Sequence, residues 1–232
     1  MFSLYLIPVP LTEHTNAHYI ISYPLLNSVR FFIVESAREA RRNLRRIGFT
    51  TSFDECTFFE WNKHDNTNNP VSSWLNHCKD ADMALLSDAG CPAVADPGAE
   101  VVAMAHQSGI PVVPLIGPSS ILLSLMGSGL NGQSFAFNGY LPVDPLKRKE
   151  KIKQFEQHSL VHRQTQIFIE TPYRNQSVIN DLLSILHPST KLCIAAGLTS
   201  DQQYLFTDSV SSWKSKRFTL DKVPAVLLFL RE

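Results

Sequence analysis

The stretch "LLSDAGCPAVADPG", residues 85–98, decides how the N-terminal half of the chain is expected to fold. A short apolar run ends at Ser87, a tight Asp-Ala-Gly turn comes next, and a segment with helical spacing begins near Pro97. This order of strand, turn and helix places ligands at the carboxyl end of a parallel strand. Gly90 permits a positive φ or a close approach of the backbone, whereas Pro92 stiffens the residues after it. The residues match neither a P-loop nor a GxGxxG motif, and they leave open a ligand-binding loop and an ordinary connection.

The sequence on both sides of this stretch alternates between short apolar runs and segments of helical spacing. Apolar runs bounded by turn residues are typical of buried parallel strands. The runs lie at Leu4–Pro8, Phe31–Val34, Ala84–Ser87 and Val112–Leu115, and the helical segments include Ser36–Ile47 and Ala99–Ser108. Gly109, followed by Pro111, gives the second of these helices a stop signal. The alternation predicts βαβ units and a mostly parallel sheet in the first half.

The pattern changes after Gly117, where an apolar helix is expected at Ser119–Gly127. Strands are then expected within residues 131–142 and at Gln166–Glu170, Lys191–Ala196, Gln203–Ser209 and Ala225–Leu230, with helices at Asp144–Gln157 and Tyr173–Leu186. We therefore predict an α/β protein with two domains, residues 1–116 and 117–232, the second built on a mixed sheet. The polar segment Asn62–Pro70 is the most loop-like part of the chain.

Composition and charge narrow the class of protein. Of the 232 residues 44% are hydrophobic and 18% are charged, which is an ordinary globular balance. The formal net charge is zero, so no global field attracts nucleic acid or an anionic membrane, although local basic patches can act alone. No apolar run approaches the roughly 20 residues of a membrane span, and the N-terminus lacks a basic region and a cleavage site for export. The four cysteines have no CxxC spacing, which predicts neither a metal site nor disulfides and favours a cytoplasmic location.

Four motifs in order resemble those of the tetrapyrrole methylase superfamily. They are "LLSDAGCPAVADPG", "VPLIGPSS", "FAFNGYLP" and "FIETPYR", and the N-terminal strand "LYLIPVP" is compatible with them. The branch that the chain most resembles methylates a cytidine ribose 2′-hydroxyl of small-subunit ribosomal RNA. The resemblance implies two α/β/α domains, S-adenosylmethionine (SAM) in a cleft between them, a homodimer and no metal. Carried over position by position, it implies cofactor contacts at Pro8, Asp88, Gly90, Cys91, Pro92, Val94, Pro118, Ser119 and Ser120.

Three carboxylates at motif positions are candidates for a catalytic base: Glu35, Asp88 and Glu170. Methyl transfer from a sulfonium needs positioning and a dry site more than a nucleophile or a metal, but a ribose hydroxyl would benefit from a nearby base. Each carboxylate also has a structural interpretation. Glu35 can stabilise a helix dipole, Asp88 can cap a turn, and Glu170 can pair with Arg174.

Two basic clusters are candidates for contacts with RNA phosphates. Arginines in the segment Ser36–Ile47 repeat at helical spacing and line one helix face, and a second cluster comes after the "GYLP" motif. From these clusters we single out Arg38, Arg41, Arg45, Lys147 and Arg148. Ribosomal RNA or the small ribosomal subunit is therefore an expected partner, and a solvated surface is the alternative for each cluster.

The chain departs from the ribosomal branch where that branch carries charge. The branch's Arg-Glu-Leu-Thr-Lys segment with a later Glu is here "AAGLTSDQQ", which places Ala196, Gly197, Ser200 and Gln203 at four formerly charged positions. The donor-side motifs persist while charges expected on the acceptor side are lost. Three hypotheses are compatible with this pattern: a methyltransferase of ribosomal RNA, a SAM-dependent methyltransferase of a small-molecule acceptor, and a SAM-binding or RNA-binding protein without turnover.

Overall fold

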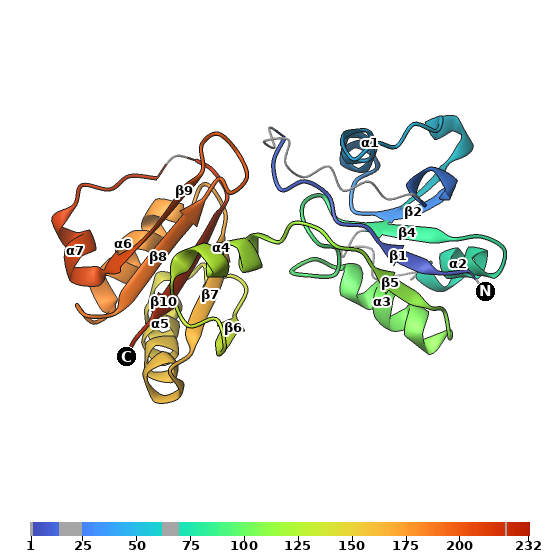
Figure 1. Ribbon diagram of the computed structural model, residues 1–232. Coiled ribbons are helices and arrows are strands. Elements are labelled where there is room, and N and C mark those ends of the chain that lie inside the picture. The colour runs from blue at the N-terminus through green and yellow to red at the C-terminus, as the bar shows by residue number, and fades with distance from the viewer. Residues whose placement is uncertain (1, 14–24, 62–69, 221) are drawn as a thin grey trace. The chain divides into compact units, whose positions relative to one another are not determined.

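The computed structural model describes residues 2–13, 25–61, 70–220 and 222–232. The chain divides into two compact units, Met1–Ser119 and Ser120–Glu232, and each unit has its own five-stranded sheet (Figure 1). The domain limits expected from the sequence, residues 1–116 and 117–232, stay a prediction. So does the cleft that the resemblance implies.

The first unit is built on a sheet in which every pair of strands is parallel. Its strands are β1 (Leu4–Leu6), β2 (Phe31–Val34), β3 (Thr57–Glu60), β4 (Met83–Leu86) and β5 (Val112–Pro114). Their order in the sheet is β3-β2-β4-β1-β5. The carboxyl ends of parallel strands meet at one edge, so the loops after β4, β1 and β5 are neighbours.

Helices cover both faces of this sheet. The helix α1 (Ala37–Arg46) places Ala40 and Leu44 against Phe32 and Val34 on one face. On the other face α2 (Val71–Leu75) and α3 (Gly98–Gln107) pack on apolar side chains of β1, β2 and β4. Short 3-10 helices lie at Leu26–Ser28 (η1), Phe53–Glu55 (η2) and Asn76–Lys79 (η3). The first unit is therefore an α/β/α sandwich.

The second unit is built on a mixed sheet of the order β6-β7-β10-β8-β9. Its strands are β6 (Phe135–Phe137), β7 (Thr165–Glu170), β8 (Lys191–Ala196), β9 (Tyr204–Ser209) and β10 (Ala225–Leu230). The strands β6 and β7 pair in parallel, and the other pairs of this sheet are antiparallel. The helix α4 (Ser120–Ser128) packs on β8, β9 and β10.

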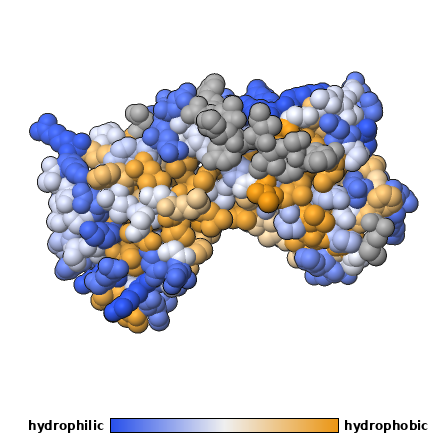
Figure 2. Space-filling model, in the orientation of Figure 1, coloured by the Kyte–Doolittle hydropathy of each residue, from blue (hydrophilic) through white to orange (hydrophobic). Residues whose placement is uncertain are grey.

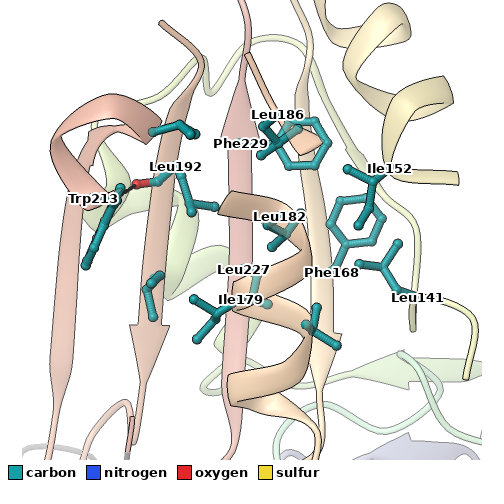
Figure 3. Packing of buried hydrophobic residues seen from close by; sticks show 13 residues of the cluster. Leu141, Ile152, Phe168, Ile179, Leu182, Leu186, Leu192, Trp213, Leu227 and Phe229 are labelled. Atoms are coloured by element: carbon teal, nitrogen blue, oxygen red, sulfur yellow. Dashed lines mark hydrogen bonds between the residues drawn. The ribbon is translucent and has the colours of Figure 1, made fainter. Parts of the chain in front are cut away.

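The core of the second unit lies between the sheet and three helices. These are α5 (Pro145–His162), α6 (Asn175–Ile185) and α7 (Val210–Ser215). Figure 3 shows Ile179 and Leu182 of α6 over the strands that carry Phe168 and Leu227. The indole of Trp213 is buried beside them and donates a hydrogen bond to the carbonyl oxygen of Leu192 at 2.8 Å, which satisfies its polar atom.

The predicted fold class is confirmed, and most of the expected elements are present. The bounds expected for β2, β8 and β10 are those observed. The strand β3 and the helices α2 and α7 were not expected, and α5 runs five residues beyond its expected end at Gln157. Of the expected loop Asn62–Pro70, only Pro70 lies within the described residues.

Candidate functional site

Three loops of the first unit meet at the carboxyl edge of β4, β1 and β5. Val9 lies just after β1 and pairs with Gly90 in an isolated antiparallel bridge, with N–H···O distances of 2.9 and 3.1 Å. The Cys91 thiol lies 3.3 Å from the carbonyl oxygen of Pro118, in the loop after β5. The three motif segments are therefore in direct contact, although they are far apart in the sequence.

Gly117 is the closest point of this contact. A Cβ built at this position would lie 2.0 Å from the Cβ of Pro8, a separation that real side chains do not reach. The loop after β5 can therefore lie against the loop after β1 only because residue 117 has no side chain. Gly117 was not singled out from the sequence, although its place between two motif segments was a signal.

The loop after β4 has an unusual backbone. Gly90 has φ +73°, and Ala93 and Ala95 adopt positive φ values of 65° and 63°. Each alanine in this region costs roughly 1–2 kcal/mol, since its Cβ crowds the following carbonyl oxygen. Asp96 helps to hold the conformation, because its Oδ1 accepts hydrogen bonds from the N–H groups of Ala93 at 2.9 Å and Gly98 at 2.7 Å. The loop is thus fixed in a strained shape.

The peptide groups of Asp88 are held from two sides. Its N–H donates to Oε1 of Glu35 at 3.1 Å, and its carbonyl oxygen accepts a hydrogen bond from Nδ2 of Asn43 at 2.9 Å. Asn43 is only 2% exposed and lies on the buried face of α1. Sequence reasoning missed Asn43, whose signal is a polar residue next to Leu44 on the apolar face of a helix.

The carboxylates near this turn have raised pKa values. Burial is the main cause for Glu35, and the negative charge of Asp96 adds to it, while the hydrogen bond from Asp88 acts in the opposite direction. Burial also raises the pKa of Asp88, with contributions from Glu35 and Glu39, against a hydrogen bond from the backbone of Ser36. Negative charge is therefore concentrated at this edge of the sheet.

Most of the predicted cofactor contacts are brought together in the first unit. Residues of the three neighbouring loops supply them, namely Pro8, Asp88, Gly90, Cys91, Pro92, Val94, Pro118 and Ser119. Ser120 is instead the first residue of α4 and belongs to the second unit. Of the predicted catalytic residues, Glu35 and Asp88 lie side by side, joined by the hydrogen bond described above.

Glu170 ends β7 in the second unit and forms a structural contact. It is buried, its Oε2 lies 3.2 Å from Nη2 of Arg174, and its Oε1 accepts a hydrogen bond from the N–H of Thr171 at 2.8 Å. The ion pair with Arg174 is the interpretation that the sequence left open beside catalysis. A catalytic role for Glu170 stays a prediction.

The basic candidates differ in their surroundings. Arg38 and Arg41 are exposed on α1, and the Arg41 guanidinium lies 4.9 Å from the ring centre of Phe58. Arg45 is also exposed, but its Nη1 donates to the carbonyl oxygens of Phe49 at 2.7 Å and Thr51 at 3.0 Å. These contacts leave Arg38 as the least engaged of the three.

The choice of Arg148 as an RNA contact is wrong. Its side chain is buried, and its guanidinium lies 2.6 Å from Oδ2 of Asp181 on α6. The apolar face of α5 points toward the core, and Arg148 occupies that face beside Ile152. Lys147, the preceding residue, is exposed and keeps its candidate role.

The formerly charged positions in "AAGLTSDQQ" form a turn that is held by its own hydrogen bonds. Ala196 ends β8 and is fully buried, while Gly197 has φ +55°. Ser200 donates to the carbonyl oxygen of Gly197 at 2.7 Å, and the side-chain oxygen of Gln203 accepts from the N–H of Thr199 at 3.0 Å. Neutral residues suit this turn, since a charge at the buried Ala196 would need a partner.

The described part of the chain also limits other kinds of site. Within it, no group of three histidine, cysteine or acidic side chains is placed to hold a metal ion. Nor does any helix found there combine the length and apolar character needed to cross a membrane.

Known proteins similar to this chain include methyltransferases. It is 32% identical over 196 residues to ribosomal RNA small subunit methyltransferase I of Vibrio cholerae, covering 84% of this chain and 65% of that protein. It is 30% identical over 209 residues to the protein of the same name from Bacillus subtilis, covering 90% and 68%. The chain thus spans about two thirds of the length of these curated relatives. No family model matches it.

A solved structure shares the fold. Uroporphyrin-III C-methyl transferase from Thermus thermophilus, complexed with S-adenyl homocysteine, superposes with a TM-score of 0.57 at 15% identity. The match covers 99% of this chain and 97% of that one, so it includes both sheets.

Proposed function

The chain belongs to the ribosomal RNA small subunit methyltransferase I family, and from this premise we propose that it is a SAM-dependent methyltransferase of ribosomal RNA. The observation that carries the proposal is the convergence of three motif loops at one edge of the first sheet, joined through Val9, Gly90 and Gly117. The acceptor that we propose is a ribose 2′-hydroxyl, as in the branch that the motifs resemble.

The residues at this edge fit SAM on two counts. Glu35 and Asp88 place negative charge beside the loop after β4, which complements a sulfonium cation. Glycines at positions 90 and 117 let the loops meet without side chains between them. When bound, SAM supplies an electrophilic methyl group. We propose that Pro8, the turn from Asp88 to Val94 and the segment Pro118–Ser120 hold it.

The chain's own contribution to the reaction is positioning and proton transfer. The hydrogen bonds to Glu35 and from Asn43 fix the turn at Asp88, and a fixed turn orients a bound cofactor. A ribose hydroxyl must lose its proton as the new bond forms. Glu35 and Asp88 are the proposed bases, because burial raises the pKa of each toward the range in which a carboxylate accepts protons well.

Contacts with RNA are proposed at exposed cations. Arg38, Arg41 and Arg45 lie on α1, and Lys147 lies in the first turn of α5. Neutralising phosphates at such residues releases counterions, so binding should weaken as salt is raised. The small ribosomal subunit is the proposed partner.

We extend the proposal to a cytoplasmic homodimer. Leu122 and Met126 are exposed on α4, and Phe135 is exposed on the edge strand β6. Exposed apolar side chains that gather on one element are typical of surfaces that bind another protein chain. Light scattering of the purified protein tests this, and a monomer at all concentrations would argue against it.

A second candidate function is SAM binding without turnover. The turn at Gly197–Gln203 favours it, since its polar groups bond to one another and the charges that the ribosomal branch carries there are absent. A small-molecule acceptor remains the third hypothesis. The three are separated by which step fails.

Two experiments test the proposal in order. Calorimetry with SAM should give saturable binding, and absence of binding at high micromolar SAM would remove the interpretation as a methyltransferase altogether. Labelled SAM is then incubated with the protein and small subunits from a strain that lacks the corresponding methyltransferase. Label in ribosomal RNA supports the proposal, whereas SAM binding with no label in RNA would leave a different acceptor or no turnover.

A further inference from the structure

A loop of the second unit presents apolar side chains to solvent. The segment Gly139–Leu146 joins β6 to α5, and in it Tyr140 is 55% exposed, Val143 75% and Leu146 74%. Tyr173, which lies after β7, is 86% exposed. In the view of Figure 2 apolar and charged residues lie side by side over α5. Exposed apolar residues grouped in this way commonly mark a binding surface.

The loop is held rigidly despite its exposure. Nη1 of Arg148 donates to the carbonyl oxygens of Pro142 at 3.2 Å and Val143 at 2.9 Å. Nη2 of Arg174 donates to the carbonyl oxygens of Leu141 at 2.8 Å and Pro142 at 3.2 Å. Two guanidinium groups therefore fix three consecutive peptide carbonyls.

Both arginines are themselves held by carboxylates. Arg148 pairs with Asp181 at 2.6 Å, and Arg174 pairs with Glu170 at 3.2 Å. The side chain of Leu141 is buried and lies beside Ile152 and Phe168 in the core (Figure 3). The loop is thus anchored from inside, so its outward side chains are pre-organised and lose little entropy when they bind.

The two exposed tyrosines belong to neighbouring segments. The strands β6 and β7 are parallel, so the residues after them lie at the same edge of the sheet. The N–H of Ile169 donates to the carbonyl oxygen of Gly139 at 3.0 Å, and Arg174 reaches Leu141. Tyr140 and Tyr173 are therefore each adjacent in sequence to residues that contact the other's segment.

Cations surround these rings. The Nζ atom of Lys222 lies 5.8 Å from the ring centre of Tyr173, and Lys147 and Lys149 are exposed in the first turns of α5. Within the described residues none of these lysines has an ion pair. The nearby carboxylate of Asp144 caps α5 by accepting a hydrogen bond from the N–H of Lys147 at 2.8 Å. The surface therefore carries positive charge around aromatic rings.

We propose that the braced loop Gly139–Leu146 and Tyr173 form a stacking surface for unpaired bases of RNA, with Lys147, Lys149 and Lys222 near its phosphates. Rigid exposed rings flanked by cations are what a single strand requires, since bases stack on the rings while lysines neutralise the backbone. The inference rests on the proposed function, because it identifies how the RNA acceptor is held.

The test measures binding of the full-length protein to a fluorescently labelled single-stranded RNA of mixed sequence. Tyr140→Ala and Tyr173→Ala should each weaken binding about tenfold, because stacking on one ring is lost. Tyr140→Phe and Tyr173→Phe keep the ring and should bind as the wild type does. Phe2→Ala, at an exposed aromatic residue of the first unit, is the matched control and should have no effect.

Salt dependence separates stacking from charge. The tyrosine variants should keep the wild-type slope of log affinity against log salt, since they remove no cation. Lys147→Ala with Lys222→Ala should flatten that slope by about one to two units. Thermal unfolding and SAM affinity, measured in parallel, should be unchanged in all these exposed-site variants.

The outcomes distinguish this inference from the function beneath it. If the wild type binds RNA and the alanine variants bind equally well, the stacking surface is wrong while the function stands. If the variants change the oligomeric state seen by light scattering and not the RNA affinity, the surface is a subunit interface and the inference fails. If the wild type binds SAM but neither binds nor methylates RNA, the proposed function fails and the inference falls with it.

Discussion

The loop after β4 and the loop after β6 both begin at the carboxyl end of a strand, yet they are held by opposite means. Residues 87–98 are held by backbone contacts, by positive φ values and by carboxylates that accept from peptide N–H groups. Residues 139–146 are held by arginines that donate to peptide carbonyls. The first arrangement concentrates negative charge, and the second leaves apolar side chains and lysines outside. This contrast suits a cationic cofactor in one unit and an anionic polymer in the other.

Breaking the brace of the second loop should have the largest effect. Arg148→Met leaves Asp181 without its partner in a mostly buried place, which should lower the free energy of unfolding by about 3–5 kcal/mol. Urea denaturation measures the change. Lys147→Met, at the exposed neighbour, is the control and should stay within about 0.5 kcal/mol of the wild type. A similar stability for both variants would show that the brace carries no weight.

Crowding the first set of loops should come next. Gly117→Ala places a Cβ into Pro8, so the loops must separate, at a cost of about 1–3 kcal/mol of stability. SAM affinity should fall at least tenfold, as calorimetry would reveal. Gly132→Ala is the matched control, because nothing lies within 4 Å of a Cβ at that position. Unchanged SAM binding in Gly117→Ala would separate the loop contact from the cofactor site.

Releasing one side of the Asp88 turn should have a smaller effect. Asn43→Leu keeps the approximate size of the side chain but removes the donor to the Asp88 carbonyl, which should cost about 1 kcal/mol of stability. SAM should bind several-fold more weakly, since the turn is less fixed. Asn180→Leu, at an exposed helical asparagine of the second unit, should leave SAM affinity unchanged. Equal SAM affinity in both variants would contradict a positioning role for Asn43.

The smallest effect concerns the charge on Glu35. Its pKa lies above the ordinary value of 4.5, so the folded protein binds its proton more tightly than the unfolded chain does. This contribution favours folding at low pH and is lost as pH rises through the raised pKa. In Glu35→Gln the stability should fall less steeply over the pH range just above 4.5 than in the wild type, as denaturation at several pH values would show.

The same variant separates two roles of Glu35. The amide oxygen of Glu35→Gln can still accept the hydrogen bond from the Asp88 N–H, so SAM affinity should stay near that of the wild type. A base role predicts that methyl transfer nevertheless falls by about 10²–10⁴. Methyl transfer at the wild-type rate would leave Glu35 as a positioning residue alone.

The parts of the fold that have a strong local pattern could be predicted from the sequence. The runs FFIV and AVLLFL are buried along most or all of their length, and their strands have the expected bounds. The strand β3 was missed because it lies at the sheet edge with polar ends, so "TFFE" lacks the buried pattern. The helix α5 was predicted too short because it ends at Arg163 in the left-handed region, where glycine would have marked the stop.

The candidate site was predictable only where motifs carried it. The residues around Asp88 and Pro118 were found from ordered motifs, and the structure brings their loops together. The hydrogen bond from Asn43 could not be found, because it joins a helix to a loop 45 residues away. Arg148 was misplaced because a run of cations in the sequence does not reveal which one faces the core.

The position of β1 has a consequence for how the first unit folds during synthesis. This strand is made first, but Leu4 pairs only with Met83 and Val112, so the middle of the sheet waits for segments made much later. Pairings of such high sequence separation form slowly, since a long chain must first be closed into a loop. We expect the nascent first unit to stay incomplete until β5 has left the ribosome, the particle whose RNA the family is named for.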